Sequence, residues 1–394
     1  MGDVCEEVSG NNGNVKGLPI LTISAANGWM NQKDRFSQVI AGNELKKYTL
    51  LEKGHLAYNH GNSKLAKYGT VFVQNLYDQA LVPRVYHSFK MKTENNPYYV
   101  EYYFATKKLD RELARLVTSG ARMDGLLNIN KKDFFKIKFK VPIPVEQSLI
   151  STILQKLDQT ITLHEEKQRQ LERLKKALLE KMFRDETGYP ILRFKGFNNV
   201  WKQRKLGEVS SLRGRIGFRG YKQTDLVEKG KGAITFSPSD IDANGNISFL
   251  NNKYISIRKY EESPEIQVNT GDILFTKTAS IGKIGYVKKL NEKATINPQI
   301  ALLTPKIDFN GYFIFLSIRN DVFMRKVQKI VGGSSVPTMS QEKLKNLAIN
   351  FPSSIEQHKL ATIFLKIDGL ITLHQHKIDN LKHLKCALLQ KMFV

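Results

Sequence analysis

Apolar residues recur at steps of three and four through two long stretches of the chain, residues 146–183 and 356–393. Neither stretch contains an internal proline. This spacing places the apolar side chains on one narrow stripe of a helix, which is the pattern of a coiled-coil seam. The pattern predicts two long helices, and each of them needs a partner to cover its stripe.

The two stretches are copies of one another. Residues 146–147 recur as 356–357, and residues 181–183 recur as 391–393, at a constant offset of 210 positions. Roughly half of the aligned positions are identical, and the alignment has no gap. Such a repeat decides the architecture more strongly than any local signal. The simplest partner for each helix is the other copy, and the alternative is a pair of ordinary core helices from unrelated domains.

The predicted seam includes a histidine in each copy. A polar register-setting role in a coiled coil suits these histidines better than metal ligation, because no Cys or acidic pair lies at ligand spacing around them. The seam residues that we single out are Leu157, Ile161, His164, Leu171, Ile367, Ile371, His374 and Leu381.

The rest of the chain divides into two globular units. In the first, apolar and β-branched runs predict strands at residues 18–23, 69–75 and 79–89. Asn96 and Pro97 open a predicted helix that continues over 98–117. In the second unit, strands are predicted at 233–236, 254–257, 272–276, 284–287 and 300–303, and a helix at 312–330.

The two halves of the chain follow one plan. In each, a β-rich globular part is followed by a helix, a proline turn and a long helix. The predicted fold class is α+β, with two similar globular domains separated by two long helices. The expected boundaries are residues 1–142 for the first domain, 143–185 for the first long helix, 186–352 for a linker and the second domain, and 353–394 for the second long helix.

The charge balance points to a polyanionic partner. The formal net charge is +24, from 61 Lys and Arg against 37 Asp and Glu, which indicates nucleic acid or an anionic membrane. No apolar run is long enough to span a bilayer, and the N-terminus lacks the pattern of a signal peptide. Two cysteines make neither a disulfide framework nor a zinc site. We therefore expect a cytoplasmic protein without a membrane partner.

Catalytic constellations are not apparent in the sequence. Ser280-Ile281-Gly282-Lys283 lacks the first glycine and the final Ser or Thr of a phosphate loop. No carboxylate pair has a convincing nuclease spacing, and no histidine lies in a metalloprotease or Ser-His-Asp context. We therefore expect a binding protein, with no catalytic residue, no metal site and no cofactor of its own.

Three kinds of stretch combine basic residues with small, polar or aromatic ones. They are the segment 213–222, the segment 276–283 with its counterpart 59–68, and the loop after each predicted helix. Glycine permits close approach to a phosphate, Arg and Lys pair with phosphate or guanine, and Asn pairs with adenine. The expected DNA-binding residues are Asn59, Asn62, Ser63, Lys64, Lys67, Tyr68, Arg122, Arg213, Arg215, Arg219, Tyr221, Lys222, Lys277, Thr278, Ser280, Lys283, Ser334 and Ser335.

The repeat resembles the conserved regions of the specificity subunit of type I restriction–modification systems. In each copy, Glu-Gln precedes a long helix that ends in Leu-Leu-x-Lys-Met-Phe. Residues 192–197, Trp201 and 206–209 look like that family's entry into a target recognition domain, and 333–339 is similar to its loop before the conserved helix. The lead-in has no counterpart before the first unit, which starts at Met1; a missing leader and a genuine start both fit.

The resemblance implies two recognition domains that each read half of a bipartite double-stranded DNA site. It implies that the two conserved helices pack as an antiparallel coiled coil and hold the domains apart. It also implies two methyltransferase subunits with S-adenosylmethionine, and restriction and translocase subunits that use ATP and Mg. Since the two domains differ in sequence, we expect an asymmetric target. Two alternatives remain, which are a stand-alone DNA-binding regulator and a methyltransferase or nuclease with divergent motifs.

Overall fold

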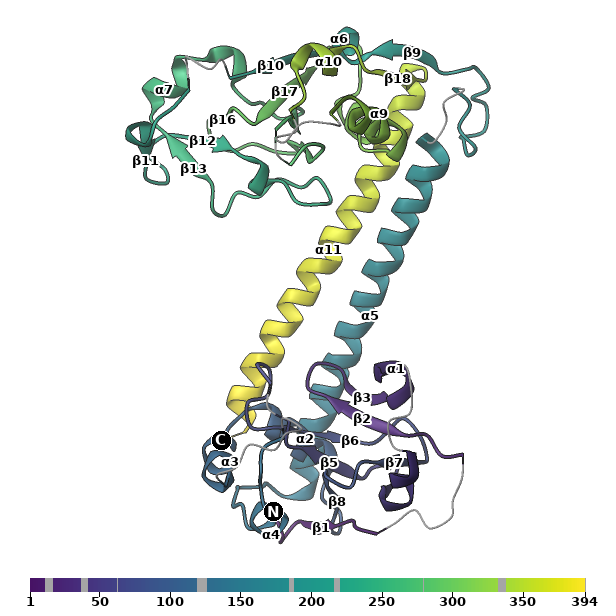
Figure 1. The fold of residues 1–394 in the computed structure, drawn as a ribbon, viewed down its shortest axis with the longest axis vertical. Coiled ribbons are helices and arrows are strands. Elements are labelled where there is room, and N and C mark those ends of the chain that lie inside the picture. The colour runs from purple at the N-terminus through teal and green to yellow at the C-terminus, as the bar shows by residue number, and fades with distance from the viewer. Residues whose placement is uncertain are drawn as a thin grey trace. The chain divides into compact units, whose positions relative to one another are not determined.

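The structure is a computed structural model of the 394-residue chain. It describes residues 1–10, 17–36, 42–61, 63–118, 126–183, 188–215, 220–278, 280–331 and 338–393, with residues 42–44 described by their backbone alone. The chain forms two compact units, residues 1–166 with 375–394 and residues 167–374. Both long helices, α5 (Pro144–Phe183) and α11 (Ser354–Met392), contribute to both units (Figure 1).

The first unit contains a four-stranded antiparallel sheet in the order β1-β8-β5-β6. Two strand pairs, β2 with β3 and β4 with β7, accompany it. The strands are β1 (Cys5–Glu7), β2 (Leu21–Ser24), β3 (Gly28–Asn31), β4 (Thr49–Glu52), β5 (Leu56–Asn59), β6 (Thr70–Val73), β7 (Gln79–Val82) and β8 (His87–Met91). The helices are α1 (Gln32–Phe36), the 3-10 helix η1 (Gly42–Lys47), α2 (Pro97–Ala105), α3 (Asp110–Leu116) and α4 (Lys131–Phe135).

The second unit repeats the antiparallel sheet in the order β10-β17-β14-β15. It adds a sheet β11-β13-β12-β16, in which β12 and β16 are parallel, and the pair β9 with β18. The strands are β9 (Lys202–Lys205), β10 (Ser210–Gly214), β11 (Leu226–Val227), β12 (Ala233–Phe236), β13 (Lys253–Ile255), β14 (Ile273–Thr276), β15 (Ile284–Tyr286), β16 (Ala294–Ile296), β17 (Ile300–Pro305) and β18 (Ala348–Phe351). The helices are α6 (Leu206–Val209), η3 (Gln223–Asp225), η4 (Pro238–Asp240), α7 (Ile257–Glu261), η5 (Pro264–Ile266), α8 (Gly311–Ile318), α9 (Asp321–Val331) and α10 (Gln341–Lys345).

The two units correspond element by element. Strands β1, β8, β5 and β6 match β10, β17, β14 and β15 in both order and direction. Helices α2, α3 and α4 then match α8, α9 and α10, and each unit's series leads into a long helix. The duplication seen in the long helices therefore extends through the globular parts, although the sequences there have diverged.

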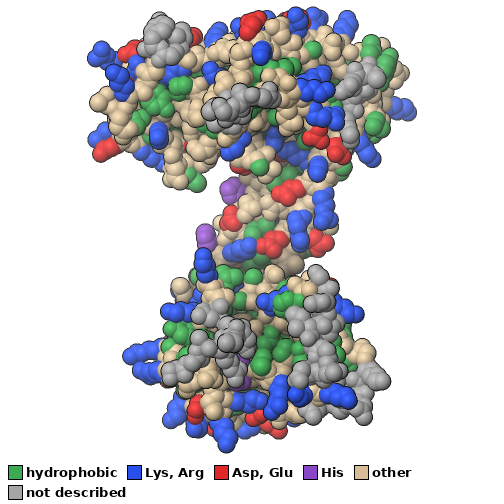
Figure 2. All heavy atoms as spheres, in the orientation of Figure 1, with side chains coloured by type: hydrophobic (Ala, Val, Ile, Leu, Met, Phe, Trp, Pro, Cys, Tyr) green, Lys and Arg blue, Asp and Glu red, His purple; other side chains and the backbone are tan. Residues whose placement is uncertain are grey.

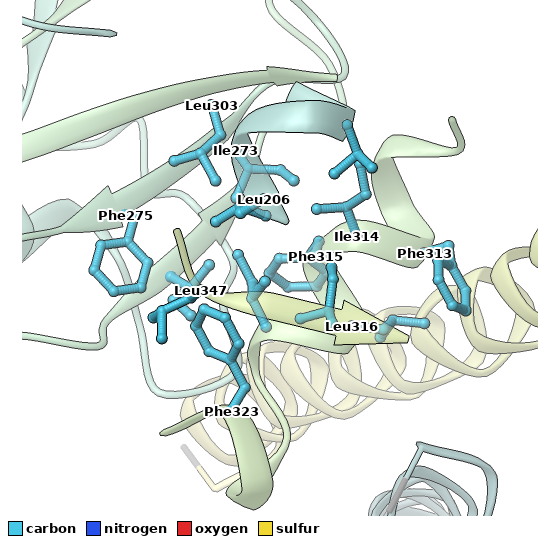
Figure 3. Close-up of a cluster of buried hydrophobic side chains, with 14 of the residues drawn as sticks. Leu206, Ile273, Phe275, Leu303, Phe313, Ile314, Phe315, Leu316, Phe323 and Leu347 are labelled. Atoms are coloured by element: carbon cyan, nitrogen blue, oxygen red, sulfur yellow. The ribbon is translucent and has the colours of Figure 1, made fainter. Parts of the chain in front are cut away.

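The end of each long helix inserts an aromatic ring into the core of a unit. Phe393 is fully buried in the first unit, where its ring centroid lies 4.9 Å from that of Tyr99. Phe183 is buried in the second unit against Phe313 and Phe364. The larger core around Phe313 joins the sheet to α8, α9 and α11, and Figure 3 shows many of its side chains converging between these elements. Burial of this apolar surface explains the Met-Phe at the end of the repeat.

Within each unit the two long helices run antiparallel. In the first unit, Asp158 of α5 pairs with Lys385 of α11, and Glu165 pairs with Lys382. Residue numbers therefore rise along α5 as they fall along α11. In the second unit, Lys175 pairs with Asp368, and Phe183 further along contacts Phe364. This packing confirms the predicted antiparallel arrangement of the copies in each unit.

Several predicted elements are divided in the structure. The strand predicted at 79–89 is two strands, since Pro83 directly follows β7 and has no N–H to continue a ladder. The helix predicted over 98–117 stops after α2, where Lys107 takes a left-handed φ of 60°. The helix predicted at 312–330 is also two helices, because Asn320 accepts from the backbone N–H of Phe323 and begins α9. The strand predicted at 254–257 ends at Ile255, since Ser256 caps α7.

Candidate nucleic-acid interface

The β5–β6 hairpin carries six of the predicted DNA-binding residues of the first unit, Asn59 at the end of β5 and Asn62, Ser63, Lys64, Lys67 and Tyr68 in the loop. Lys64 and Lys67 are exposed, and the Lys67 ammonium lies 5.4 Å from the centre of the Tyr68 ring. The Asn59 side chain donates to the Ile23 carbonyl at 3.1 Å and accepts from the Gly61 amide at 3.1 Å. The Ser63 hydroxyl accepts from the Ala66 amide. Asn59 and Ser63 therefore shape the loop, while the lysines present their charge to solvent.

Leu126 and Leu127 lie beside this hairpin. Gly61 and Leu126 form an antiparallel bridge, and the Leu127 amide donates to the His60 carbonyl at 2.8 Å. The end of the loop that follows α3 is thus joined to the hairpin loop. Two predicted residues of this region, Asn62 and Arg122, lie outside the described residues.

His60, which the sequence interpretation missed, is the side chain that holds these segments together. It is 2% exposed, and its ring nitrogens lie 2.6 Å from the Leu127 carbonyl and 2.7 Å from the Val85 carbonyl. Its ring also lies 4.9 Å from that of His87, between centroids. An apolar strand followed directly by a histidine was the one available signal. Nothing in the sequence showed that this histidine points inward.

The second unit brings the corresponding segments together in the same way. The β14–β15 hairpin matches β5–β6, and Thr278 in its loop forms an antiparallel bridge with Thr338, beyond α9. The Lys277 carbonyl accepts from the Met339 amide at 2.8 Å. Lys277 is half-buried, and burial lowers the pKa of its ammonium. Ser280 and Lys283 are exposed, with the Lys283 ammonium 3.2 Å from the Pro238 carbonyl.

The end of β10 joins this group of segments. Gly214 lies so close to the hairpin loop that an added Cβ would stand 3.3 Å from the Lys277 Nζ and 2.4 Å from the Gln341 Nε2. A side chain here would require the flexible ends of Gln341 and Lys277 to move. Gly214 of the predicted segment 213–222 thus lies against the hairpin loop of segment 276–283, and Thr338 bridges to that loop. Arg219, Ser334 and Ser335, which are also predicted, lie outside the described residues.

The arginines at the end of β10 have different surroundings. Arg213 is exposed and donates to the Glu265 carbonyl at 3.3 Å. Arg215 is 5% exposed, and its guanidinium donates to the Ile296 carbonyl and the Thr295 hydroxyl, both at 3.1 Å, beside the Tyr221 ring. Burial lowers the pKa of Arg215. The structure gives Arg215 a packing role, which does not favour a DNA contact. Lys222 is exposed, and Tyr221 is half-buried.

Lys and Arg side chains are spread over the visible face of both units and outnumber Asp and Glu there (Figure 2). This agrees with the formal net charge of +24. Distributed positive charge is what neutralises the phosphates of a duplex. Contact with DNA stays a prediction for every one of these side chains.

The predicted seam residues lie on the inward stripe of the long helices. Ile161 and Ile367 are 7% and 6% exposed. The other six are half-buried, and these are Leu157, His164, Leu171, Ile371, His374 and Leu381. Among the residues that the structure describes, no group of three or more His, Cys, Asp or Glu side chains could hold a metal ion. In the same residues, no helix is both long and apolar enough to cross a membrane.

A family model described as "Type I restriction modification DNA specificity domain" matches residues 6–173 and again residues 198–383. The chain belongs to this family. The two matches fall on the two halves of the duplication.

Two type I specificity subunits match different shares of the chain. The type I restriction enzyme MjaVIII specificity subunit of Methanocaldococcus jannaschii is 24% identical over 72% of this chain and 67% of its own length. The MjaIX specificity subunit of the same organism is 27% identical over 32% of this chain and 28% of its own length.

The fold is shared with solved structures. The S subunit of a type I restriction–modification system from M. genitalium matches with a TM-score of 0.60 at 14% identity, covering 100% of this chain and 94% of that one. A chain from a study of complex assembly and conformational transition in a type I system matches with a TM-score of 0.50 at 14% identity, covering 100% and 96%. At this identity the likeness concerns the fold.

Proposed function

We propose that this chain is the DNA specificity subunit of a type I restriction–modification complex, in which each unit reads one half of a bipartite site. The observation that carries the proposal is the duplicated convergence of loops. In each unit the loop of one hairpin, β5–β6 or β14–β15, bridges to the segment that follows the second helix after the sheet. Side chains on two adjoining loops can enter one groove of a duplex, as base readout requires.

The half-sites that the two units read differ. The hairpin loop of the first unit presents Lys64 and Lys67, whereas that of the second presents Thr278, Ser280 and Lys283. Hydrogen-bonding groups of different kinds at equivalent places select different base edges. An asymmetric target with an unread spacer follows, and the paired helices set the spacer length.

The chain recognises DNA and leaves chemistry to its partners. Methyl transfer from S-adenosylmethionine to adenine belongs to two modification subunits. Translocation and cleavage with ATP and Mg belong to restriction subunits. The chain itself supplies no catalytic residue in this scheme, and it acts in the cytoplasm, where the chromosome lies.

The start of each long helix offers a docking surface for a modification subunit. Val145, Leu149 and Ile153 on the first turns of α5 are 67%, 62% and 42% exposed and lie one helical turn apart. Ile355, the repeat of Val145, is 67% exposed at the start of α11. It lines a groove of about 600 Å³ together with Phe194, Thr362 and Ile363. An apolar stripe with this spacing fits the apolar face of a partner helix.

The test is adenine methylation in cells that carry the modification subunit of the same system, with and without this chain. We expect methylated adenines in one bipartite sequence of two unlike half-sites and a fixed spacer, only when the chain is present. Tight sequence-specific binding by the chain alone, with no methylation and no capture of the modification subunit, would support the stand-alone regulator instead. Binding of S-adenosylmethionine or cutting of DNA by the purified chain would support an enzyme.

A further inference from the structure

One aspartate in the first unit joins three helices. Asp158 of α5 pairs through Oδ1 with the Lys385 ammonium of α11 at 2.5 Å. Its Oδ2 accepts from the Tyr102 hydroxyl of α2 at 2.8 Å. Helix α2 packs on strand β6 of the four-stranded sheet of the first unit. A single carboxylate thus links both long helices to the recognition domain.

The second unit contains the same kind of cluster, but there the aspartate lies on α11 and the lysine on α5. Asp368 of α11 pairs with the Lys175 ammonium of α5 at 2.5 Å and accepts from the Tyr312 hydroxyl of α8. Lys288 also lies 3.4 Å from this carboxylate. The aspartate comes from α5 in one unit and from α11 in the other, as the repeat requires, because Asp158 corresponds to Asp368 and Lys175 to Lys385.

The tyrosines hold different places in their helices. Tyr102 lies in the second turn of α2, well after the N-cap Asn96, whereas Tyr312 directly follows the first residue of α8, after the N-cap Asn310. The residue of α2 that follows its first residue is Tyr98, and the Tyr98 hydroxyl accepts from Asn75 instead. The helices are therefore seated differently in the two units, while the hydroxyl–carboxylate contact is kept. The contact is thus present in both units in spite of a shift of one helical turn.

The physical setting makes these clusters suited to fix register. The seam between the long helices is mainly aliphatic, and aliphatic seams tolerate sliding because one apolar side chain replaces another. A buried ion pair does not tolerate it, since each charge would lose its partner in a poorly solvated place. Lys175 and Asp368 are 14% and 11% exposed. Lys385 and Asp158 are 25% and 40% exposed, and the Tyr102 hydroxyl gives Asp158 a second partner. Lys382 and Glu165, which pair on the same two helices, are 54% and 41% exposed.

We propose that the two Tyr–Asp–Lys clusters are positioning sites that lock the register of α5 against α11 and seat each recognition domain on the pair. They thereby determine how many unread base pairs separate the half-sites. This inference rests on the proposed function and adds the residues that set the spacing.

The experiment uses the chain in complex with its modification subunits and a set of duplexes whose half-sites are separated by the natural spacer or by one or two base pairs more or fewer. The variants are Tyr102→Phe with Tyr312→Phe, and Asp158→Asn with Asp368→Asn. We expect the ratio of methylation at the natural spacer to methylation at its neighbours to fall about tenfold, with both half-site sequences unchanged.

Glu165→Gln is the matched control, because it breaks an exposed ion pair between the same helices and should leave the ratio unchanged. The tyrosine variants remove only a hydroxyl, so they keep the test open if the asparagine variants do not fold. Variants that fold and retain the natural ratio overturn the inference. Failure of the unaltered complex to methylate any bipartite site overturns the proposed function instead.

Discussion

The backbone N–H of Asn96 donates to Oε1 of Gln147 at 3.1 Å, and this bond ties the start of α2 to the start of α5. Gln357 accepts in the same way from the Asn310 N–H at 3.2 Å, at the start of α8. The amide groups of both glutamines also donate to a proline carbonyl five residues earlier, Pro142 or Pro352. The Glu-Gln dipeptide of the repeat is therefore a joint between each recognition domain and its long helix.

Replacing either glutamine with alanine should destabilise its unit. Gln147 and Gln357 are 1% and 3% exposed, so each change leaves a backbone N–H and a carbonyl without their side-chain partner. The expected loss in free energy of unfolding is about 1–3 kcal/mol. Urea denaturation measures it, and Gln159→Ala is the control, since Gln159 is an exposed residue of α5. Equal stability of all three variants would show that the joint contributes nothing.

The two glutamates that precede these glutamines should contribute differently to the free energy of unfolding. Glu356 is 1% exposed and receives two hydrogen bonds from the Arg193 guanidinium, at 2.9 and 2.7 Å. Glu146, its repeat, is exposed. Arg193→Ala leaves a buried carboxylate without this partner, so we expect a loss of about 3–5 kcal/mol.

Glu146→Ala is the comparison for this pair, because an exposed carboxylate contributes little. We expect its unfolding curve to overlay that of the unaltered protein, while that of Arg193→Ala shifts to lower urea concentration. A large effect of Glu146→Ala would mean that the exposed glutamate has a role that the structure does not show.

Glu101 should make the first unit less stable as the pH rises. Burial, only partly offset by the hydrogen bond from the Val73 amide, raises the pKa of Glu101 from 4.5 to about 7. The folded state therefore holds its proton more tightly than the unfolded state. The resulting stability is present below pH 4.5 and is lost as the pH rises through about 7. The change amounts to about 3 kcal/mol.

Glu101→Gln tests this, since the amide keeps an acceptor for the Val73 N–H but does not titrate. We expect the free energy of unfolding, followed from pH 4 to pH 8, to fall less steeply in the variant. Parallel pH profiles of the two proteins would contradict the assignment.

The long helices could be predicted because their signal is local and doubled. Helix α5 begins at Pro144 and α11 at Ser354, within the predicted ranges 143–185 and 353–394 and two residues before the repeated Glu146 and Glu356. The strands predicted at 233–236, 272–276 and 284–287 also lie where the structure has β12, β14 and β15. In these strands, continuous apolar burial leaves a pattern in the sequence itself.

The contacts that organise the site depend on tertiary neighbours and left no such pattern. Arg215 reads as a basic loop residue in a Gly-rich segment, yet the Ile296 carbonyl and the Thr295 hydroxyl draw it into the interior. Asp158 and Lys385 are ordinary helix-surface types, and only the antiparallel register brings them together. The seating of Tyr102 and Tyr312 in different turns could not be derived from either helix alone.

The exposed lysines of the β5–β6 loop should contribute to DNA affinity through phosphate charge rather than base identity. Each phosphate contact that a lysine makes adds about 0.9 to the slope of log K against log salt concentration. Lys64→Ala combined with Lys67→Ala should therefore lower the slope by about 2 and weaken binding to cognate and unrelated duplexes by similar factors. Fluorescence anisotropy of the assembled complex at several salt concentrations measures both quantities.

Lys377→Ala is the control, since Lys377 is an exposed lysine of α11 outside the hairpin loop. The slope for this variant should equal that of the unaltered complex. An unchanged slope in the double variant would remove this loop from the DNA interface, and weaker binding to the cognate duplex alone would assign it to base readout instead.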